Sequence, residues 1–506
     1  MKKNPLKLFR CEKEFGFFFF LLLFTNAFFS FTFGKPLADP VHPNIVIIFM
    51  DDMGYGDPEF NDGIGYTTPH MDELAARGMR FTNFYAAQPV CTASRAGILT
   101  GCYPNRIHMY AAFTPWMTDA LNPKEETIAG MLKKTGYRTC MVGKWGLGGL
   151  PPFTPTHYGF DRYLGLLFSN DMWPVDYGGR PIEDTSNRKF RYPPLGLYEG
   201  DSVIKYIKTI KDQGELTQEY THFAVNFIKQ NAHHPFFLYF AHSMVHVPIM
   251  ASPMFLGKSG AGLFGDVMEE VDWSIGQIMK TLRETGVAKN TLIIFTSDNG
   301  PWLNYGNHAG NTGGFKEGKG ENFEGGIREP CVMVWPEHIP QGVICNKIAS
   351  TIDILPTVAN ITGAPLPKVK IDGVNILPLL LNKPGANPRT DFVYYYYKNS
   401  LEAIREGEWK LVFPHRGISY KVYSPGNDGM PGKVAKVKIP MALYHLSVDP
   451  GETLDVQAER PDVVKKLEAL ADKYRQDLGD DLTGVKGSGR RPEGVCKKCA
   501  TNYRTP

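Results

Sequence analysis

One short segment places a cysteine one helical turn before an arginine. The segment is Cys91-Thr92-Ala93-Ser94-Arg95, and residues four apart share a face if a helix begins here. A helix N-terminus presents free N–H groups and the positive end of its dipole, and an arginine adds a planar cation. The segment therefore predicts an oxyanion-binding site at Cys91. The alternative is a half-buried structural cysteine beside a surface arginine.

Two acidic pairs directly follow apolar runs that read as buried strands. Asp51-Asp52 follows Asn44–Met50, and Asp298-Asn299 follows Thr291–Thr296 and Ser297. Ligands of open α/β sheets collect at the carboxyl ends of strands. Oxygen-only ligands favour Ca²⁺ or Mg²⁺ over zinc. The two pairs together predict one metal site, although either pair alone would fit a helix cap or a turn.

Two lysines and a histidine are expected at the same sheet edge. Lys144 follows the strand predicted over Arg138–Val142, His246 follows the strand predicted over Phe236–Ala241, and Lys319 lies in a glycine-rich segment. Each alone would be an ordinary surface lysine or a buried histidine with satisfied hydrogen bonds. Together, two cations and a titratable base favour an anionic ester as substrate.

With these residues in view, the chain closely resembles the formylglycine-dependent sulfatases of the alkaline phosphatase superfamily. The resemblance runs from about Pro43 to about Asp477, and Cys91 to Arg95 is similar to the family signature, whose cysteine is oxidised to formylglycine. It implies one Ca²⁺ held by Asp51, Asp52, Asp298, Asn299 and the modified Cys91. It also implies sulfate-binding and acid–base roles for Arg95, Lys144, His246, Lys319 and Ser169.

The resemblance implies a mechanism that needs no water to attack sulfur. A hydrated aldehyde at residue 91 offers two hydroxyls, and one, activated by Ca²⁺ and by Asp298 as base, attacks sulfur. Arg95, Lys144 and Lys319 neutralise the sulfuryl oxygens, and His246 donates a proton to the leaving alcohol. The second hydroxyl then collapses to the aldehyde and expels sulfate.

One position departs from the family pattern. Many relatives carry histidine where this chain has Gly146, two residues after Lys144. That histidine is usually assigned as the base for sulfate expulsion, so the departure puts the second half-reaction in doubt. Either another group replaces this histidine, with His108, His157 and His308 as candidates from their closeness to motifs, or water does, or turnover is slow. His308 is also our candidate for a substrate-pocket residue.

The chain of 506 residues is long enough for a large domain and a smaller one. Apolar strands alternate with helices, which predicts an α/β fold with a large, mixed, mostly parallel sheet flanked by helices. We expect a catalytic domain over 40–380, a smaller C-terminal α+β domain with an antiparallel sheet over 385–485, and a loose tail over 486–506. The expected helices are Glu126–Thr135, Glu215–Gln230, Asp266–Thr285 and Pro461–Leu478.

The first 35 residues read as a secretory signal, because lysines and arginines precede an apolar run. The cleavage point is not evident, and an uncleaved anchor is the alternative. We therefore expect a secreted or periplasmic protein without a membrane span in its mature form. A net charge of +3 gives no reason to expect nucleic-acid binding. Cys496 and Cys499 fit a local disulfide or two thiols better than a zinc site.

The expected partners are a sulfated small molecule or carbohydrate and the enzyme that generates formylglycine. Trp116, Trp173 and Trp302 are candidates for stacking on sugar rings or for ordinary packing. Two other functions stay open: a phosphodiesterase or phosphonate-ester hydrolase on the same fold, and a non-catalytic protein that binds sulfated glycans.

Overall fold

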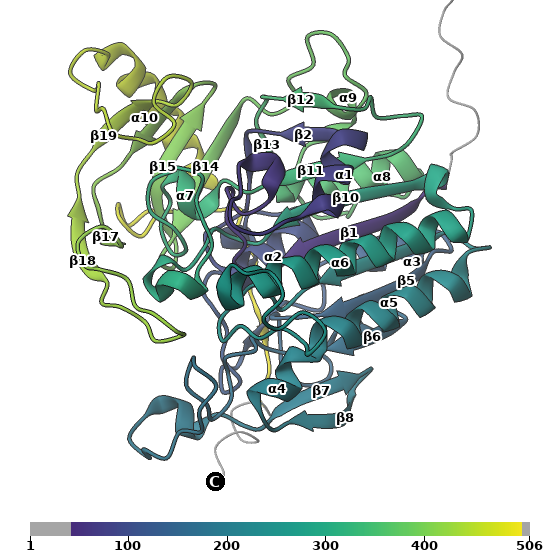
Figure 1. Cartoon of the computed structure of the whole chain (residues 1–506). Helices are drawn as coiled ribbons and strands as arrows, with labels where there is room; N and C mark the ends of the chain where they lie inside the picture. Colours follow the sequence, from purple (N-terminus) through teal and green to yellow (C-terminus); the bar gives the residue numbers. More distant parts are fainter. Residues whose placement is uncertain (1–41, 498–506) are drawn as a thin grey trace, which may run out of the picture. The chain divides into compact units, whose positions relative to one another are not determined.

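A ten-stranded sheet forms the centre of residues 42–497, the part of the chain described by a computed structural model (Figure 1). The predicted signal peptide and Cys499 lie outside the described residues. In spatial order the strands are β12 (Val343–Cys345), β2 (Met79–Phe81), β11 (Cys331–Val334), β10 (Thr291–Ser297), β1 (Asn44–Met50), β9 (Phe236–Ala241), β5 (Arg138–Gly143), β6 (Arg162–Gly165), β7 (Leu195–Glu199) and β8 (Ser202–Ile207).

The five strands β10, β1, β9, β5 and β6 are parallel, and β11, β7 and β8 pair antiparallel with their neighbours. The predicted mixed, mostly parallel α/β sheet is confirmed. The register between β1 and β10 aligns Met50 with Ser297. Asp51 and Asp298 therefore directly follow an aligned pair at the carboxyl ends of two adjacent strands.

Both faces of the sheet are covered, which explains why its central strands are apolar throughout. On β1, Ile45, Ile47 and Phe49 belong to one buried cluster, while Val46 and Ile48 belong to the other. The first cluster includes residues of α2 (Cys91–Thr100), α3 (Ile128–Lys133) and α8 (Ile354–Thr362). The second includes residues of α1 (Pro69–Arg77), α5 (Leu216–Asn231) and α6 (Gly262–Glu284).

A four-stranded antiparallel sheet follows in the C-terminal part. Its order is β14 (Asp391–Tyr396), β15 (Ser400–Glu406), β16 (Trp409–Val412) and β19 (Ala442–His445). Helix α10 (Pro461–Leu478) packs on it through Leu467 and Ala471. A separate two-stranded ribbon pairs β17 (His415–Ser419) with β18 (Ala435–Ile439). The shorter elements are α4 (Ile210–Gly214), α7 (Glu324–Ile327), α9 (Leu377–Leu380), β3 (Phe84–Tyr85), β13 (Ala349–Ser350), β4 (Asp119–Ala120) and β20 (Gly494–Val495).

The expectation of a loose tail from residue 486 was wrong for its described portion. β20 pairs antiparallel with β4, and the Arg491 guanidinium binds the Glu125 carboxylate at 2.7 and 2.8 Å. Arg490 also donates to His108 at 2.7 Å. The expectation failed because these partners lie more than 360 residues earlier in the chain.

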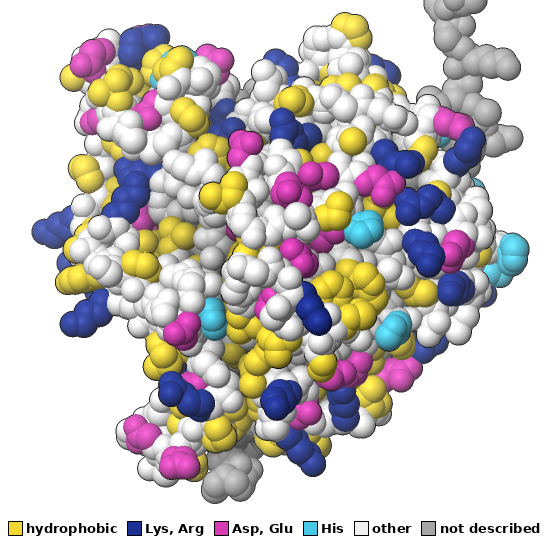
Figure 2. Space-filling model, in the orientation of Figure 1, with side chains coloured by type: hydrophobic (Ala, Val, Ile, Leu, Met, Phe, Trp, Pro, Cys, Tyr) yellow, Lys and Arg dark blue, Asp and Glu magenta, His cyan; other side chains and the backbone are white. Residues whose placement is uncertain are grey.

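Within residues 42–497, no helix has the length and apolarity needed to cross a membrane. On the face drawn in Figure 2, basic and acidic side chains are interspersed over α5 and α6. This mixture agrees with the small net charge of the chain.

Candidate active site

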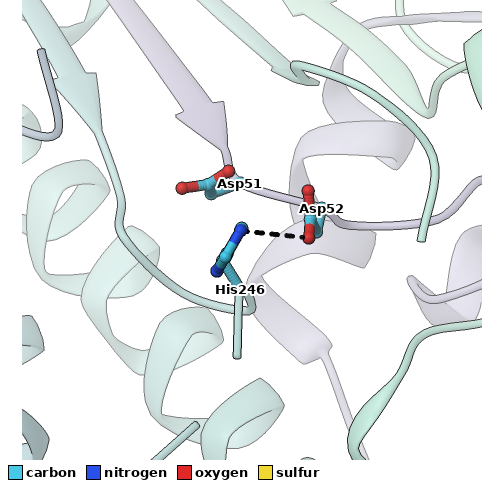
Figure 3. Close-up of side chains that lie close together, drawn as sticks. All are labelled: Asp51, Asp52 and His246. Carbon is cyan, nitrogen blue, oxygen red and sulfur yellow. Dashed lines mark ion pairs between the residues drawn. The ribbon is translucent and has the colours of Figure 1, made fainter. Parts of the chain in front are cut away.

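The ends of β1 and β10 bring the two predicted acidic pairs together. The Asp52 backbone N–H donates to Asp298 Oδ1 at 3.2 Å, and Asn299 Nδ2 donates to Asp52 Oδ1 at 2.8 Å. Asp51, Asp298 and Asn299 are fully buried. Figure 3 shows Asp51 and Asp52 at the end of β1, with the His246 ring facing them.

Two buried oxygens at this place lack a hydrogen-bond partner. They are Asp51 Oδ1 and Asn299 Oδ1, and both belong to the predicted metal ligands. A buried acceptor left unsatisfied costs about 1–3 kcal/mol, and a hard cation satisfies such oxygens directly. Asp51, Asp52 and His246 also offer ligand atoms that lie within 4.8 Å of one another. The residues therefore fit a metal ion, and the unpaired oxygens favour an oxygen-binding one.

Two buried lysines bind the carboxylates after β1. Lys144 Nζ lies 2.6 Å from Asp51 Oδ2, and Lys319 Nζ lies 2.6 and 2.8 Å from the two oxygens of Asp52. Lys144 comes from the end of β5, which places it two strands from β1 in the sheet. These contacts keep both cations beside the carboxylates without solvent between them.

Arg95 completes the charge balance. Its Nη2 lies 2.8 Å from Asp298 Oδ2 and 3.5 Å from Asp51 Oδ2, and its Nη1 donates to the Lys144 carbonyl at 3.1 Å. The arginine is fully buried. Three carboxylates thus face three cations, so a bound divalent cation would give the site a net positive charge that suits a sulfate ester.

Burial and charge move the pKa values of the two facing carboxyls in opposite directions. Burial alone would raise the pKa of Asp51, but the charges of Lys144 and Arg95 outweigh it and hold that pKa below its ordinary value. Burial and the charge of Asp51 raise the pKa of Asp298 to about 7, against the pull of Arg95. Asp298 is therefore the more easily protonated of the two carboxyls.

Cys91 is the first residue of α2, and its side chain is 4% exposed. Burial raises the pKa of its thiol, although Lys144 and Lys319 act in the opposite sense. The predicted helix start is confirmed, and it places residue 91 within electrostatic reach of both lysines, Asp51 and Asp298.

His246 and Ser169 lie in the same cluster. His246 Nδ1 donates to the Val247 carbonyl at 2.5 Å, so Nε2 is the nitrogen that faces Asp52 Oδ2, at 3.7 Å. Burial and the charge of Lys319 lower the pKa of His246. Ser169 Oγ lies 3.3 Å from Lys144 Nζ and 3.4 Å from His246 Nε2.

Comparison with known proteins agrees with this geometry. The sulfatase family model matches residues 43–364, and the model of the C-terminal region of aryl-sulfatase matches residues 388–503. The chain belongs to the sulfatase family. It is therefore a sulfuric ester hydrolase with an alkaline phosphatase-like fold.

Individual relatives cover most of the chain. Arylsulfatase A of Homo sapiens is 36% identical over 461 residues, which span 86% of this chain and 88% of that protein. N-acetylgalactosamine-6-sulfatase of Sus scrofa is 34% identical over 499 residues, spanning 92% and 91%. The crystal structure of PsFucS1 sulfatase from Pseudoalteromonas sp. superposes with a TM-score of 0.77 at 27% identity, covering 85% of this chain and 89% of that one.

Gly146, where many sulfatases carry histidine, adopts a φ of +76°. A Cβ at this position would lie 3.4 Å from Arg95 Cδ, so the position borders the arginine of the site. Two of the proposed replacement bases make their contacts elsewhere. His108 binds Arg490 and the Arg491 carbonyl, and His157 binds side chains of its own loop and lies 3.9 Å from Asp201.

His308 is buried at the end of a short helical segment, and its Nδ1 has no hydrogen-bond partner. Burial lowers its pKa, partly offset by Asp428. Of the three tryptophans, Trp302 packs against predicted site residues. Its ring lies 4.6 Å below Lys319 Nζ and 5.6 Å from the His246 ring.

The other two tryptophans pack elsewhere. Trp116 stacks on Tyr192 at 4.5 Å, and Trp173 is buried. These contacts support the packing interpretation of both residues.

Three further residues at the site were not predicted. Asn170 Nδ2 donates to the His246 and Pro248 carbonyls and so fixes the histidine loop. Asp171 is buried with Oδ1 unpaired, and the charges of His246 and Lys189 lower its pKa against the effect of burial. The signal for both was their place directly after Ser169 in one polar run.

Tyr396 is the third of these residues. It comes from β14 of the C-terminal sheet and packs against the small buried cluster of Val90, Cys91 and Ala93. No local pattern in the sequence pointed to it.

Proposed function

We propose that this sulfatase acts outside the cytoplasm on sulfate esters of carbohydrates, using a formylglycine derived from Cys91 and one Ca²⁺. The observation that carries the proposal is the pair of unpaired buried oxygens, Asp51 Oδ1 and Asn299 Oδ1, within the balanced set of charges around Cys91. The basic and apolar start of the sequence supports export. The resemblance to N-acetylgalactosamine-6-sulfatase supports a carbohydrate substrate.

Asp51, Asp52, Asp298 and Asn299 would hold the Ca²⁺, together with residue 91. The bound ion would supply positive charge that favours a deprotonated hydroxyl at residue 91 and stabilises the sulfate oxygens. Oxidised to formylglycine, residue 91 would supply the hydrated aldehyde whose hydroxyl attacks sulfur. Asp298 would accept the proton of that hydroxyl.

The remaining residues bind and orient the ester. Lys144, Lys319 and Ser169 present donors on one side of the cluster, where they would bind sulfuryl oxygens. Arg95 holds Asp298 and Asp51 in place, so much of its positive charge is neutralised by these two carboxylates. As the imidazolium, His246 would donate its Nε2 proton to the leaving alcohol, because its Nδ1–H is held by the Val247 carbonyl. Asp52 and Asp51 favour this charged form of the ring, against burial and the charge of Lys319.

Mass spectrometry of the peptide that contains Cys91 tests the modification. In protein from the native host, we expect residue 91 to be lighter than cysteine and to carry an aldehyde that reacts with hydrazide reagents. An unmodified cysteine in active protein would refute the formylglycine mechanism. The Cys91→Ala variant should fold and release no sulfate.

Matched nitrophenyl sulfate and phosphate esters test the reaction class. We expect sulfate release that chelation abolishes and Ca²⁺ restores. Faster turnover of the phosphate or phosphonate ester would favour the related hydrolases instead, and affinity for sulfated glycans without any turnover would favour a binding protein. A panel of sulfated oligosaccharides then identifies the substrate.

A further inference from the structure

The ribbon of β17 and β18 carries a concentrated positive charge. Residues 415–439 contain five basic residues and one acidic residue, a net charge of +4, whereas the whole chain has +3. All five basic side chains are exposed: Arg416, Lys421, Lys433, Lys436 and Lys438. Figure 2 shows lysine and arginine side chains gathered along the left edge, where Figure 1 places β17 and β18.

Three of these cations share one face of the ribbon. Arg416 pairs directly with Lys438 across the strands, and Ile418 pairs with Lys436. Residues directly opposite each other point to the same side, with Cβ atoms about 5 Å apart, and like charges in that position are destabilising. We call Arg416, Lys436 and Lys438 the basic face.

No carboxylate compensates the basic face. Among residues 42–497, none of its three cations forms an ion pair within 4.0 Å. The single acidic residue of the segment, Asp428, accepts hydrogen bonds from Asn307 and Asn427 instead. The opposite face of the ribbon packs inward through Ile439 and Val437. An anion from outside the chain would remove the repulsion.

The ribbon is also bonded to the catalytic loop. Tyr420 Oη donates to the Lys319 carbonyl at 2.6 Å, and the Tyr420 N–H donates to Glu317 at 2.9 Å. Ile418 lies on the same side of the ribbon as the basic face. Its Cδ1 lies 3.7 Å from the position that a Cβ would occupy at Gly320, next to Lys319. The ribbon that carries the basic face is therefore attached to the loop that presents Lys319 to Asp52.

We propose that the basic face binds sulfate groups of an extended, multiply sulfated glycan, at positions other than the ester being hydrolysed. This inference rests on the proposed carbohydrate substrate and narrows it to a polymer with several sulfates. Lys436 and Lys438 are two residues apart on a strand, about 7 Å, and Arg416 lies opposite Lys438 on the neighbouring strand, so the three cations form a compact group. We expect a small aryl sulfate to fill only the catalytic site and to make no contact with these three cations.

The test compares two triple variants of equal charge change. The first is Arg416→Ser/Lys436→Ser/Lys438→Ser. The control is Lys211→Ser/Lys229→Ser/Lys258→Ser, which removes three exposed lysines that form no ion pair within the described residues. Binding of a fluorescein-labelled heparin oligosaccharide is measured by anisotropy in the Cys91→Ala background, and kcat/KM for nitrophenyl sulfate is measured with Cys91 intact.

We expect the basic-face variant to bind the heparin oligosaccharide about tenfold or more weakly and with a shallower dependence on salt, since three charge contacts are lost. The control variant should bind within about twofold of the parent at physiological ionic strength, because salt screens the charges of exposed lysines that lie far from the bound glycan. Both variants should hydrolyse nitrophenyl sulfate like the parent.

Equal binding by the two variants would overturn the inference. So would equal binding of the desulfated oligosaccharide, or binding of phosphatidylserine vesicles in place of the glycan. A loss of nitrophenyl sulfate turnover in the basic-face variant would also overturn it, because the ribbon would then act by supporting Lys319. If the triple variant does not fold, Lys436→Gln/Lys438→Gln is used in its place. Failure of the proposed function is seen separately, as an absence of sulfate release by the parent.

Discussion

Replacing Lys319 by methionine should destabilise the protein in a way that depends on Ca²⁺. Lys319 Nζ bonds both oxygens of Asp52, and both side chains are buried. Removing one partner of a buried ion pair costs about 3–5 kcal/mol, because the other charge stays buried and uncompensated. A divalent cation bound to Asp52 would compensate that charge. We therefore expect Lys319→Met to lose this full amount of unfolding free energy in chelator, and less than about half of it in excess Ca²⁺.

The chain offers a matched control at a second buried lysine. Lys410 Nζ lies 3.0 Å from Glu324 Oε1 and 2.8 Å from Glu452 Oε1, and all three side chains are buried. Both glutamates lie outside the predicted metal ligands. Lys410→Met should therefore cost a similar free energy, about 3–5 kcal/mol, with and without Ca²⁺.

The assay is the midpoint of urea unfolding at fixed equilibration time, measured for the parent and both variants in chelator and in Ca²⁺. For each variant, the loss of unfolding free energy relative to the parent is determined in chelator and in Ca²⁺, and the two losses are compared. Because variant and parent are measured under the same condition, the general stabilisation by ligand binding cancels. If Lys319→Met loses as much in Ca²⁺ as in chelator, Asp52 does not hold the cation and the assignment of the metal site is refuted.

Three further outcomes follow from the same structure. Lys144→Ala should lower kcat by about 10²–10³, because the cation bonded to Asp51 is lost; steady-state kinetics with nitrophenyl sulfate checks this, and an unchanged kcat contradicts it. Burial raises the pKa of Glu321 to about 8 from 4.5, so the folded protein holds a proton that the unfolded chain releases. Its stabilising contribution is complete below pH 4.5 and is lost as the pH rises toward 8, on the order of 3 kcal/mol between pH 5 and 8. Glu321→Gln should flatten the pH dependence of the urea midpoint by that amount, and an identical pH profile contradicts the assignment. Gly146→Ala should cost about 1–2 kcal/mol, since its φ is +76°; a variant as stable as the parent in urea would show that the left-handed backbone relaxes.

The sequence predicted the ends of β1 and β10 well because their strands are continuous apolar runs with polar residues directly after them. Parallel pairing then places Asp51 beside Asp298. Cys91 was located by its signature. What could not be predicted depends on contacts between distant segments, such as the packing of Tyr396 against the cluster that contains Cys91.

The short strands β6, β7 and β8 extend the sheet but are only four to six residues long, and β8 is largely exposed. They lack the apolar runs that revealed the central strands. Arg95 pairs with both Asp298 and Asp51, and this also could not be predicted, because it depends on side-chain geometry that residue spacing does not encode.

The burial of Cys91 would set a time limit on the proposed oxidation of its thiol. All ten residues of α2 are buried, and Arg95 on that helix pairs with Asp298, which is 203 residues farther along the chain. An enzyme that oxidises the thiol has to reach it before those residues join the fold. At about 5–20 residues per second, synthesis of that intervening stretch takes about 10–40 s. Slower translation would lengthen this interval, so the active fraction of the protein should depend on the speed of the ribosome as well as on the amount of maturing enzyme.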